Sequence, residues 1–191
     1  MLITEKWLND KEACAEGIQW WKSLNTEKPE EIFRAAKTEE EFNYCVWLIQ
    51  RIFNKKQSVP FSIFCAEKVL YFWEEKYPED TRPHKAIEAA KKYISTPCKK
   101  TKEAAYAASR AASEASFASA ASAAAAAAAN ASRAASEVSF AYAADTAANA
   151  AYAAYWAAAK AAKAADWASV ASAVESLRQE ILEEAARIIS K

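Results

Sequence analysis

Residues 118–135 read ASAASAAAAAAANASRAA, and they lie at the centre of a tract dominated by alanine. Alanine accounts for 39 of the 70 residues from Ala104 to Ala173. It has the highest helix propensity, because its side chain loses no conformational entropy in a helix. It also removes little apolar surface from water, so it stabilises a bundle chiefly by letting helix backbones approach closely. The tract therefore predicts closely packed helices.

The glycine content of the whole chain favours the same fold class. The 191 residues include one glycine, Gly17, and five prolines. The phosphate-binding patterns G-x-G-x-x-G and G-x-x-x-x-G-K and the nucleophile turn G-x-S-x-G each need at least two glycines. Sheets also depend on turns rich in glycine and proline. These enzyme classes are excluded, and we predict an all-α helical bundle.

Bulky side chains are distributed unevenly along the chain. Residues 1–97 hold 15 of the 23 aromatic residues and residues 98–191 hold 8. We therefore expect an aromatic-rich set of N-terminal helices, residues 1–97, packed on long alanine-rich helices, residues 98–191. The two parts are expected to form one packed unit, in which the aromatic residues supply most of the buried area.

Several helix starts are predicted before residue 54. Thr4 is suited to cap a short first helix, and Asn9 or Asp10 a second one that contains the single glycine. Pro29 suits the first turn of a third helix. Thr38, followed by three glutamates, matches a capping box and opens the predicted central core helix.

Prolines bound the next two predicted helices. Ser58 and Pro60 are expected to start one that stops before Pro78, because the residue preceding a proline avoids the α region. Thr81 is expected to cap the following helix, which ends before Pro97.

From Pro97 onward the chain contains no further proline or glycine. One helix of about 90 residues would be about 135 Å long, so the segment must fold back into two or three long helices. The predicted turns are Asn130 to Ser132 and Asp145 to Asn149, with Asp166 as a further candidate. This segment also contains a repeat: Ser109–Ala121 recurs as Ser132–Ala144 with 11 of 13 positions identical.

The charge balance argues against polyanionic partners. Lys and Arg number 25 and Asp and Glu number 25, so no overall basic field draws the chain to nucleic acid. The uncharged stretch Ala115 to Ser132 is almost entirely Ala and Ser, which is not typical of a membrane span. The first residues show no apolar leader. We expect a cytoplasmic protein with neither a nucleic-acid nor a membrane partner.

Four cysteines and one histidine do not suggest a metal or other cofactor. The cysteines include no C-x-x-C pair, and His84 is the only histidine, so zinc is not expected. Cys14, Cys45 and Cys65 lie among apolar residues and are expected to act as small hydrophobes. A lone histidine in the first turn of a helix is typically a solvated surface residue. We therefore expect no enzymatic activity.

The tandem Trp20-Trp21 is the clearest candidate contact. Adjacent residues on a helix point about 100° apart, so both rings are buried only if the helix is covered on two sides. Either one ring is exposed as a binding anchor or both pack internally.

Residues 65–70 read CAEKVL and residues 77–90 read YPEDTRPHKAIEAA. They resemble a family of immunity proteins of bacterial toxin systems, whose members read C-A-E-x-V-L and then Y-P-x-D-x-R-P-x-x-A-I-E-A-A, followed by paired alanine-rich helices. The resemblance covers about residues 40 to 173. It implies a small protein that binds and neutralises another macromolecule, with no catalytic residues to carry over. Asp80, Arg82 and Pro83 match the motif, although physically they also suit a turn between two helices.

A second resemblance concerns the N-terminus. Trp7-Leu8, Ala13-Cys14, Gly17 and Trp20 are similar to a short motif, W-L-x(4)-A-C-x-x-G-x-x-W/F, of uncharacterised phage and prophage proteins. The two resemblances together imply a protein partner that is either a toxin or a component of bacterial defence.

Two classes of binding site follow. For a protein partner, the candidate residues are Trp20, Trp21, Asp80, Arg82 and His84. The alternative is a homo-oligomeric binder or sponge for a small molecule such as a nucleotide, with a pocket lined by Tyr152, Tyr155 and Trp156.

Overall fold

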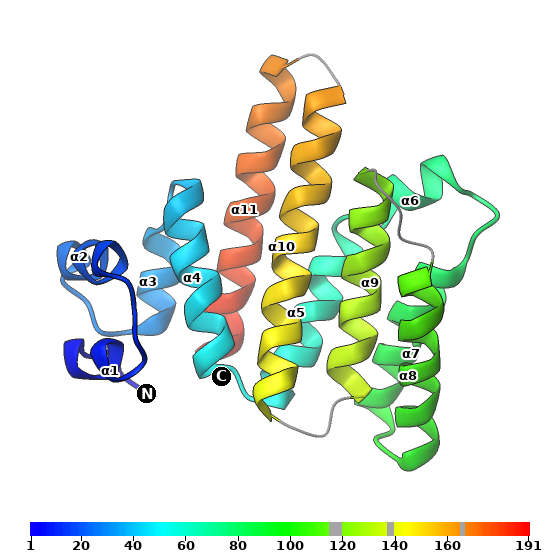
Figure 1. Cartoon of the computed structure of the whole chain (residues 1–191), viewed down its shortest axis with the longest axis horizontal. Coiled ribbons are helices and arrows are strands. Elements are labelled where there is room, and N and C mark those ends of the chain that lie inside the picture. Colours follow the sequence, from blue (N-terminus) through cyan, green and yellow to red (C-terminus); the bar gives the residue numbers. More distant parts are fainter. Residues whose placement is uncertain (115–119, 137–139, 165–166) are drawn as a thin grey trace.

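The computed structural model describes residues 1–114, 120–136, 140–164 and 167–191. Within these ranges the chain forms eleven α-helices and no strand (Figure 1), so the predicted all-α bundle is confirmed. The helices are α1 (Glu5–Asp10), α2 (Ala15–Leu24), α3 (Pro29–Ala35), α4 (Glu39–Ile52), α5 (Lys55–Glu67), α6 (Tyr71–Lys76), α7 (Arg82–Ser95), α8 (Lys99–Glu114), α9 (Ala120–Ser136), α10 (Phe140–Ala164) and α11 (Trp167–Ile189).

Three of the predicted helix starts near the N-terminus are confirmed. The hydroxyl of Thr4 accepts the backbone N–H of Trp7 at 3.2 Å and caps α1. Pro29 occupies the first turn of α3. At the start of α4, Thr38 accepts the N–H of Glu41 at 3.2 Å, and the Glu41 carboxylate accepts the N–H of Thr38 at 2.9 Å. This is the capping box that the sequence predicts.

The predicted start of the second helix is wrong. Asn9 and Asp10 lie in the last turn of α1, and α2 begins after Cys14. The Cys14 sulfur accepts the N–H of Gly17 at 3.4 Å, which gives the thiol the capping role expected of an oxygen-bearing side chain.

The predicted boundaries of the next helix are also wrong. It begins at Lys55 rather than at Ser58 or Pro60, because Asn54 and Gln57 form a capping box. Pro60 lies inside the helix. The chain does not continue as one helix to Pro78 either, since α5 ends at Glu67 and α6 is separate.

Helix α7 follows the prediction closely. It begins at Arg82 with Pro83 in its first turn, and it ends at Ser95, before Pro97. Thr81 occupies the N-cap position, although its side chain makes no capping hydrogen bond.

The described residues of the alanine-rich part form four helices, α8 to α11, rather than the two or three that were predicted. Asn130 and Ser132 lie inside α9, and Asp145 and Asn149 lie inside α10, so both predicted turns are wrong. Asp166 lies outside the described residues. The high helix propensity of the surrounding alanines outweighs the local preference of single Asn, Asp and Ser residues. The described helices instead end within the two copies of the repeat, at Glu114 and Ser136.

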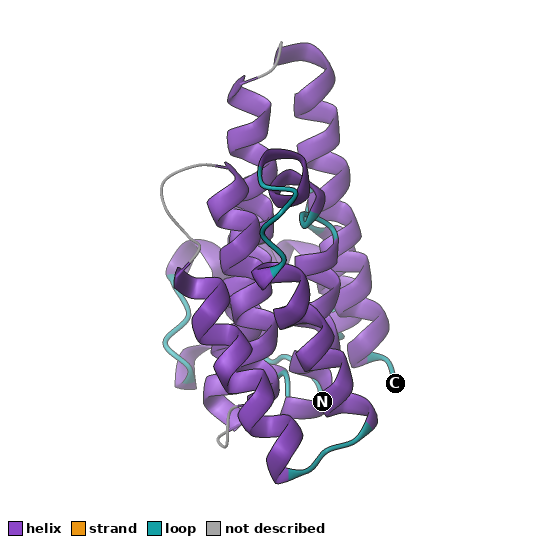
Figure 2. Cartoon of the chain, turned by 90° about the vertical axis from the view of Figure 1, so that its right-hand side faces the viewer, coloured by secondary structure: helices purple, strands orange, loops and turns teal. Residues whose placement is uncertain are grey.

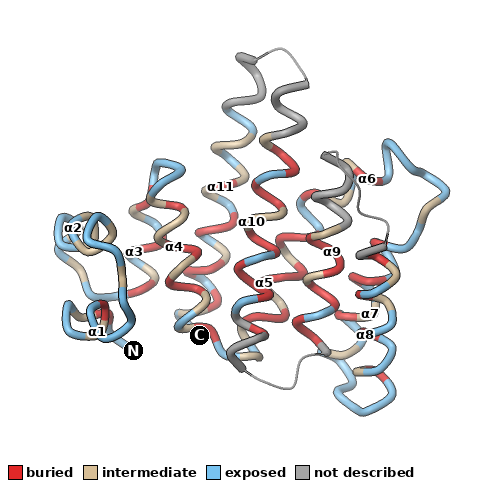
Figure 3. The backbone as a smooth tube through the Cα atoms, in the orientation of Figure 1, coloured by how far each residue is buried: buried red, intermediate tan, exposed pale blue. Residues whose placement is uncertain are grey.

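Helix α9 lies between α10 and the α7–α8 pair (Figure 1), and Figure 2 shows the bundle from the side. It packs against α5, α7, α8 and α10, while α10 also packs against α4, α5 and α11. Buried residues are frequent along α5, α9 and α10, as Figure 3 shows, and these three helices contact one another. Aromatic-rich helices from the first half of the chain therefore lie against the alanine-rich ones.

Two serine hydrogen bonds mark the close approach of α8 and α9. The buried hydroxyl of Ser132 donates to the carbonyl of Ala105 at 2.6 Å, and that of Ser109 donates to the carbonyl of Ala129 at 3.0 Å. A side chain of one carbon can reach a backbone carbonyl of the next helix only where the two backbones nearly touch. Alanine and serine at these positions permit that distance.

Polar contacts join α11 to the N-terminal helices. The Arg34 guanidinium donates to the Glu183 carboxylate, at 2.9 Å for the shorter of the bonds from its Nε. The side chain of Gln179 donates to the carbonyl of Ala36 at 2.8 Å. The carboxyl-terminal helix thus fixes α3 and the start of α4 to the bundle.

The cysteines have two different environments. Cys45 and Cys65 are buried in the core, as expected, and burial raises the pKa of both thiols well above its ordinary value. Cys14, expected in the same role, is exposed, as is Cys98. In the described ranges no three His, Cys, Asp or Glu side chains converge as metal ligands would. Nor do these ranges contain a helix whose length and apolar character would let it cross a membrane.

Candidate aromatic cavity between the N-terminal helices and α4

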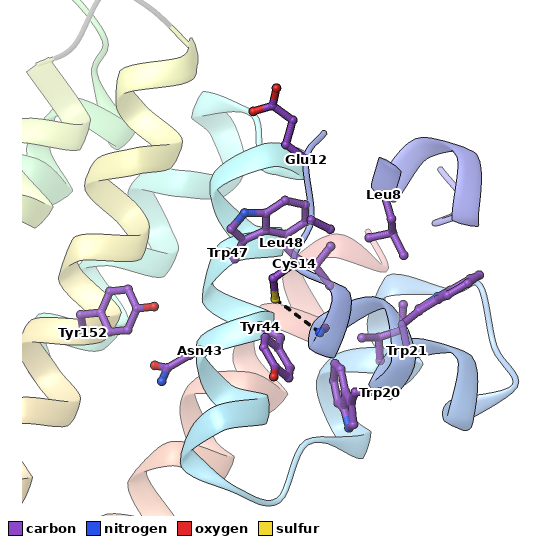
Figure 4. Close-up of a pocket in the computed structure, with 13 residues that line it drawn as sticks. Leu8, Glu12, Cys14, Trp20, Trp21, Asn43, Tyr44, Trp47, Leu48 and Tyr152 are labelled. Carbon is purple, nitrogen blue, oxygen red and sulfur yellow. Dashed lines mark hydrogen bonds between the residues drawn. The ribbon is translucent and has the colours of Figure 1, made fainter. Parts of the chain in front are cut away.

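An apolar cavity of about 270 Å³ lies between the α1–α2 pair and α4 (Figure 4). Aromatic rings form much of its wall. Its lining residues are Leu8, Glu12, Ala13, Cys14, Gly17, Trp20, Trp21, Ile32, Asn43, Tyr44, Trp47, Leu48 and Tyr152. Both tryptophans of the predicted contact and one tyrosine of the predicted ligand pocket are among them.

The turn that separates α1 from α2 shapes one end of this cavity. Glu12 has a φ of 57°, in the left-handed region. The N–H of Ala13 donates to the carbonyl of Leu8 at 3.0 Å, and the N–H of Glu12 donates to the carbonyl of Asn9 at 3.0 Å. These two bonds form a Schellman motif, in which the left-handed position normally favours glycine. Figure 4 shows the Glu12 side chain at the rim, with its carboxylate pointing away from the other lining residues.

Gly17 sets the distance between α2 and α4. A Cβ at this position would lie 3.2 Å from the Cys14 sulfur and 3.3 Å from Cδ1 of Tyr44. Both distances are shorter than ordinary van der Waals contact. The only glycine of the chain therefore allows the Tyr44 ring to lie against the first turn of α2.

Four aromatic rings form two pairs at the cavity. The rings of Trp20 and Tyr44 have centroids 5.7 Å apart, and those of Trp7 and Trp47 lie edge to face at 6.2 Å. The Arg51 guanidinium lies 3.8 Å from the centre of the Trp47 ring, a cation–π contact. These contacts join rings of α1 and α2 to rings of α4.

Trp20 and Trp21 are both partly exposed rather than fully buried. The indole N–H of Trp21 is itself buried and has no hydrogen-bond partner among the described residues. A buried donor without an acceptor is costly, because it has lost its water without a replacement. An acceptor supplied by a bound group would remove that cost.

Hydrogen bonds alter the titration of two side chains at the start of α4. The Tyr44 hydroxyl donates to the Glu40 carboxylate at 2.7 Å, and this bond together with burial raises the pKa of Tyr44 to about 12. Burial acts to raise the pKa of Glu41, but hydrogen bonds from Lys37, Thr38 and Trp20 hold it below its ordinary value. Tyr44 is thus a neutral donor and Glu41 a charged acceptor at neutral pH.

Of Tyr152, Tyr155 and Trp156, the three residues of the predicted ligand pocket, Tyr152 alone lines the aromatic cavity. The Tyr152 ring lies 6.3 Å from that of Phe42. Tyr155 is buried, 5.4 Å from the same Phe42 ring. Trp156 is 47% exposed and does not line this cavity.

Asp80, Arg82 and His84 lie at the other end of the bundle, where α6 meets α7 (Figure 1). The Arg82 guanidinium donates to the Asp80 carboxylate at 2.6 Å, and this bond lowers the pKa of Asp80. The carbonyl of Asp80 accepts the indole N–H of Trp73 at 2.8 Å. His84 lies 3.5 Å from the Glu74 carboxylate and is exposed. These contacts form a hydrogen-bonded turn.

Tyr44 and Trp47 were not predicted as cavity residues. Helix α4 was expected only as a core helix, and its buried face includes Phe42, Cys45 and Ile49. Tyr44 and Trp47 are three residues apart and lie on a neighbouring face of the same helix. An aromatic pair at that spacing, outside the buried stripe, is the signal that would have identified them.

Comparison with known proteins adds one finding. The sequence model of a family described as Immunity protein Imm5 matches residues 43–176, most of the chain. This confirms the resemblance noted for the sequence. No curated protein and no solved structure matches the chain. The matched range includes Tyr44, Trp47 and Tyr152 of the cavity, whereas Trp20 and Trp21 precede it.

Proposed function

The chain belongs to the Imm5 family of immunity proteins, and we propose that it binds a bacterial protein toxin and neutralises it without catalysing a reaction. The family match over residues 43–176 is the observation that supports this function. The charge balance and the absence of glycine-rich catalytic motifs agree with a binding protein.

We place the principal toxin contact at the aromatic cavity. Partly exposed tryptophans and tyrosines are the residues that most often dominate the energy of a protein interface. Trp20 and Trp21 contribute such rings from α2, and Tyr44 contributes one from α4. The cavity has room for an apolar side chain of the toxin.

Asp80, Arg82 and His84 have a different role in this proposal. Asp80 and Arg82 bond to each other, and the Asp80 carbonyl is occupied by Trp73. We assign Asp80 and Arg82 to the stability of the α6–α7 turn, and we propose no direct toxin contact for them or for His84.

Growth rescue tests the function directly. Toxin domains encoded beside genes of this family are expressed in a sensitive bacterium with and without the chain. Rescue of growth by the wild-type chain, with co-elution of the two purified proteins, is the expected result. Rescue without co-elution would favour neutralisation by another route. Co-elution with a bacterial defence protein instead of any toxin would favour the anti-defence version of the function.

A matched pair of variants locates the contact. Trp20→Ala removes a cavity ring, whereas Trp156→Ala removes an exposed tryptophan outside the cavity. We expect the first to weaken toxin binding at least tenfold and the second to leave it unchanged, since hot-spot truncations cost about 2 kcal/mol or more. Equal effects of the two variants would place the contact elsewhere.

The cavity itself favours a second candidate function, the binding of a small molecule. Its apolar wall and its few polar groups are typical of ligand sites, although its volume of about 270 Å³ is small. A thermal-shift screen with nucleotides and aromatic metabolites separates the two functions. A ligand that binds the folded state raises its melting temperature by mass action.

A further inference from the structure

A second surface, at the end of the bundle where α7 meets α8, is rich in lysine. We call it the basic end; it comprises Lys55, Lys56, Lys92, Lys99, Lys100 and Lys102. The first turns of α5 and α8 supply five of the six, and α7 supplies Lys92. Figures 1 and 2 show the α7–α8 connection at the lower edge of the molecule, and Figure 3 shows that the connection is exposed.

Few carboxylates of the described residues neutralise Lys56, Lys92, Lys99, Lys100 and Lys102. Lys99 approaches Glu103 at 3.9 Å, and Lys55 lies 4.8 Å from the centre of the Tyr93 ring. Lys56, Lys92, Lys100 and Lys102 form no ion pair with any described residue.

Several lysines on other parts of the surface do pair with carboxylates. Lys22 lies 2.6 Å from Glu5, Lys28 lies 2.8 Å from Glu31, and Lys68 pairs with Glu180. The basic end is therefore a local excess of positive charge on a chain whose formal net charge is zero.

Five of these lysines, all except Lys92, lie in the first turns of α5 and α8, where a positive charge is unfavourable for the fold. The N-terminus of a helix carries partial positive charge, so acidic residues stabilise its first turn and basic residues destabilise it. Helices α1, α3 and α4 follow this rule with glutamates in their first turns, whereas α5 and α8 have no acidic residue there. Basic residues in a first turn lower the stability of the helix. Where no contact inside the chain offsets that cost, the residues are candidates for a functional surface.

An apolar hollow adjoins these charges. It has a volume of about 450 Å³ and is lined by Lys55, Lys56, Val59, Pro60, Tyr93, Ile94 and Pro97. Ile94 is 47% exposed and lines the hollow together with Lys55 and Lys56, and such exposure is unusual for a branched apolar side chain. The surface thus combines an apolar hollow with a border of positive charge.

We propose that the basic end docks an acidic polypeptide segment of the protein partner. Carboxylates of that segment pair with Lys56, Lys100 and Lys102, and an apolar side chain between them enters the hollow beside Ile94. A peptide offers carboxylates and an apolar side chain within one short segment, whereas a nucleic acid or an anionic membrane surface offers the negative charge without an apolar side chain between the charges. The inference rests on the proposed function only in taking the partner to be the toxin, and it adds the location and the chemistry of a second contact.

A defined peptide tests this surface without any toxin. The probe is a fluorescein-labelled synthetic 12-residue peptide in which glutamate alternates with leucine, and its binding is followed by fluorescence anisotropy. We expect binding that weakens as the salt concentration rises, because exposed charges are screened. A peptide with glutamine in place of glutamate should bind at least tenfold more weakly. Equal binding of the two peptides would overturn the proposal.

Two triple variants with the same change in net charge provide the control. Lys56→Gln, Lys100→Gln and Lys102→Gln together should weaken binding of the acidic peptide at least tenfold. Lys6→Gln, Lys11→Gln and Lys37→Gln, on exposed residues away from the basic end, should leave it within twofold. Similar losses in both triples would mean that the peptide responds to net charge alone. Circular dichroism confirms that each variant is folded.

Further measurements test the apolar contact and the class of partner. Ile94→Ser should weaken the acidic peptide several-fold while leaving the salt dependence unchanged. A single-stranded oligonucleotide or phosphatidylserine vesicles that bind more tightly than the peptide, through the same lysines, would overturn the choice of a polypeptide. Peptide binding that persists when no toxin is neutralised would refute the proposed function alone. Toxin neutralisation without lysine-dependent peptide binding would refute only this inference.

Discussion

The ring of Tyr44 lies against Gly17 so closely that a Cβ at position 17 would come within 3.3 Å of its Cδ1. This contact joins α2, which precedes the range matched by the Imm5 family, to α4, which contains the start of that range. It also forms one wall of the aromatic cavity. The single glycine of the chain thus marks the place where the N-terminal helices meet the family-matched bundle.

Gly17→Ala should alter the shape of the cavity while it leaves the free energy of unfolding almost unchanged. Alanine gains about 0.5–1 kcal/mol over glycine in a helix, which offsets the tight contact with Tyr44 and Cys14. We expect the free energy of unfolding, measured in urea, to stay within about 1 kcal/mol of wild type. The Tyr44 ring must move, so partner binding should weaken. A crystal structure of the variant with the ring in its present place would contradict this account.

Ala105→Leu should destabilise the bundle by about 1–3 kcal/mol, because a leucine cannot fit between backbones that nearly touch. Ala105 is fully buried, and its carbonyl accepts the Ser132 hydroxyl of α9 at 2.6 Å. Ala107→Leu, on the exposed side of the same helix, is the matched control and should change stability by about 0.5 kcal/mol or less. Equal urea midpoints for the two variants would show that α8 and α9 are not closely packed.

The close packing of α8 to α11 was predictable from the sequence, but the positions of the turns between these helices were not. Alanine content indicates helices whose backbones approach closely, and the buried alanines of α9 and α10 agree with that. The turns were misplaced because Asn130 and Asp145 each lie among alanines, and the summed propensity of a long window outweighs one residue. Caps with an oxygen-bearing side chain, as at Thr38, were recognised, whereas a thiol cap at Cys14 has no established sequence signal.

Alkaline pH should destabilise the fold through two tyrosines. A hydrogen bond to Glu40 is the main cause that raises the pKa of Tyr44 to about 12, and burial is the main cause that raises that of Tyr155 to about 12. In the unfolded chain both titrate near 10. Between pH 10 and 12 the unfolded state therefore loses protons that the folded state keeps. The stabilisation is fully present below about pH 10 and is lost as the pH rises toward 12.

Tyr155→Phe tests whether ionisation of this tyrosine causes the loss of stability at high pH, because phenylalanine has no ionisable hydroxyl. Urea unfolding at pH 9 and pH 11 should show a smaller loss of stability in the variant than in wild type. A loss of the same size in both proteins would mean that Tyr155 titrates alike in the folded and unfolded states.

Lys100→Glu should raise stability while it weakens binding of the acidic peptide. The substitution places an acidic residue in the first turn of α8, which is worth about 0.3–1 kcal/mol at low salt. Lys11→Glu, after the last turn of α1, makes the same change in charge without that benefit. Thermal unfolding of both variants in low salt checks the prediction. A lower melting temperature for Lys100→Glu than for wild type would contradict it.

The candidate site was predicted only in part. Trp20 and Trp21 were recognisable because adjacent tryptophans on one helix are hard to bury together. Their partners, Tyr44 and Trp47, depend on how α2 packs against α4, and that packing is set by the Gly17 contact and by the turn at Glu12. Tyr152 comes from α10, more than a hundred residues along the chain, and no local pattern links it to the other two helices.

The central claim is that this immunity-family chain holds a protein toxin at its aromatic cavity. Isothermal titration of the purified chain with a toxin domain encoded beside a gene of its family tests it most directly. We predict binding at a one-to-one ratio for wild type and for Trp156→Ala, and binding at least tenfold weaker for Trp20→Ala. Toxin binding that is unchanged in Trp20→Ala, or a chain that binds none of the toxin domains, would contradict the account.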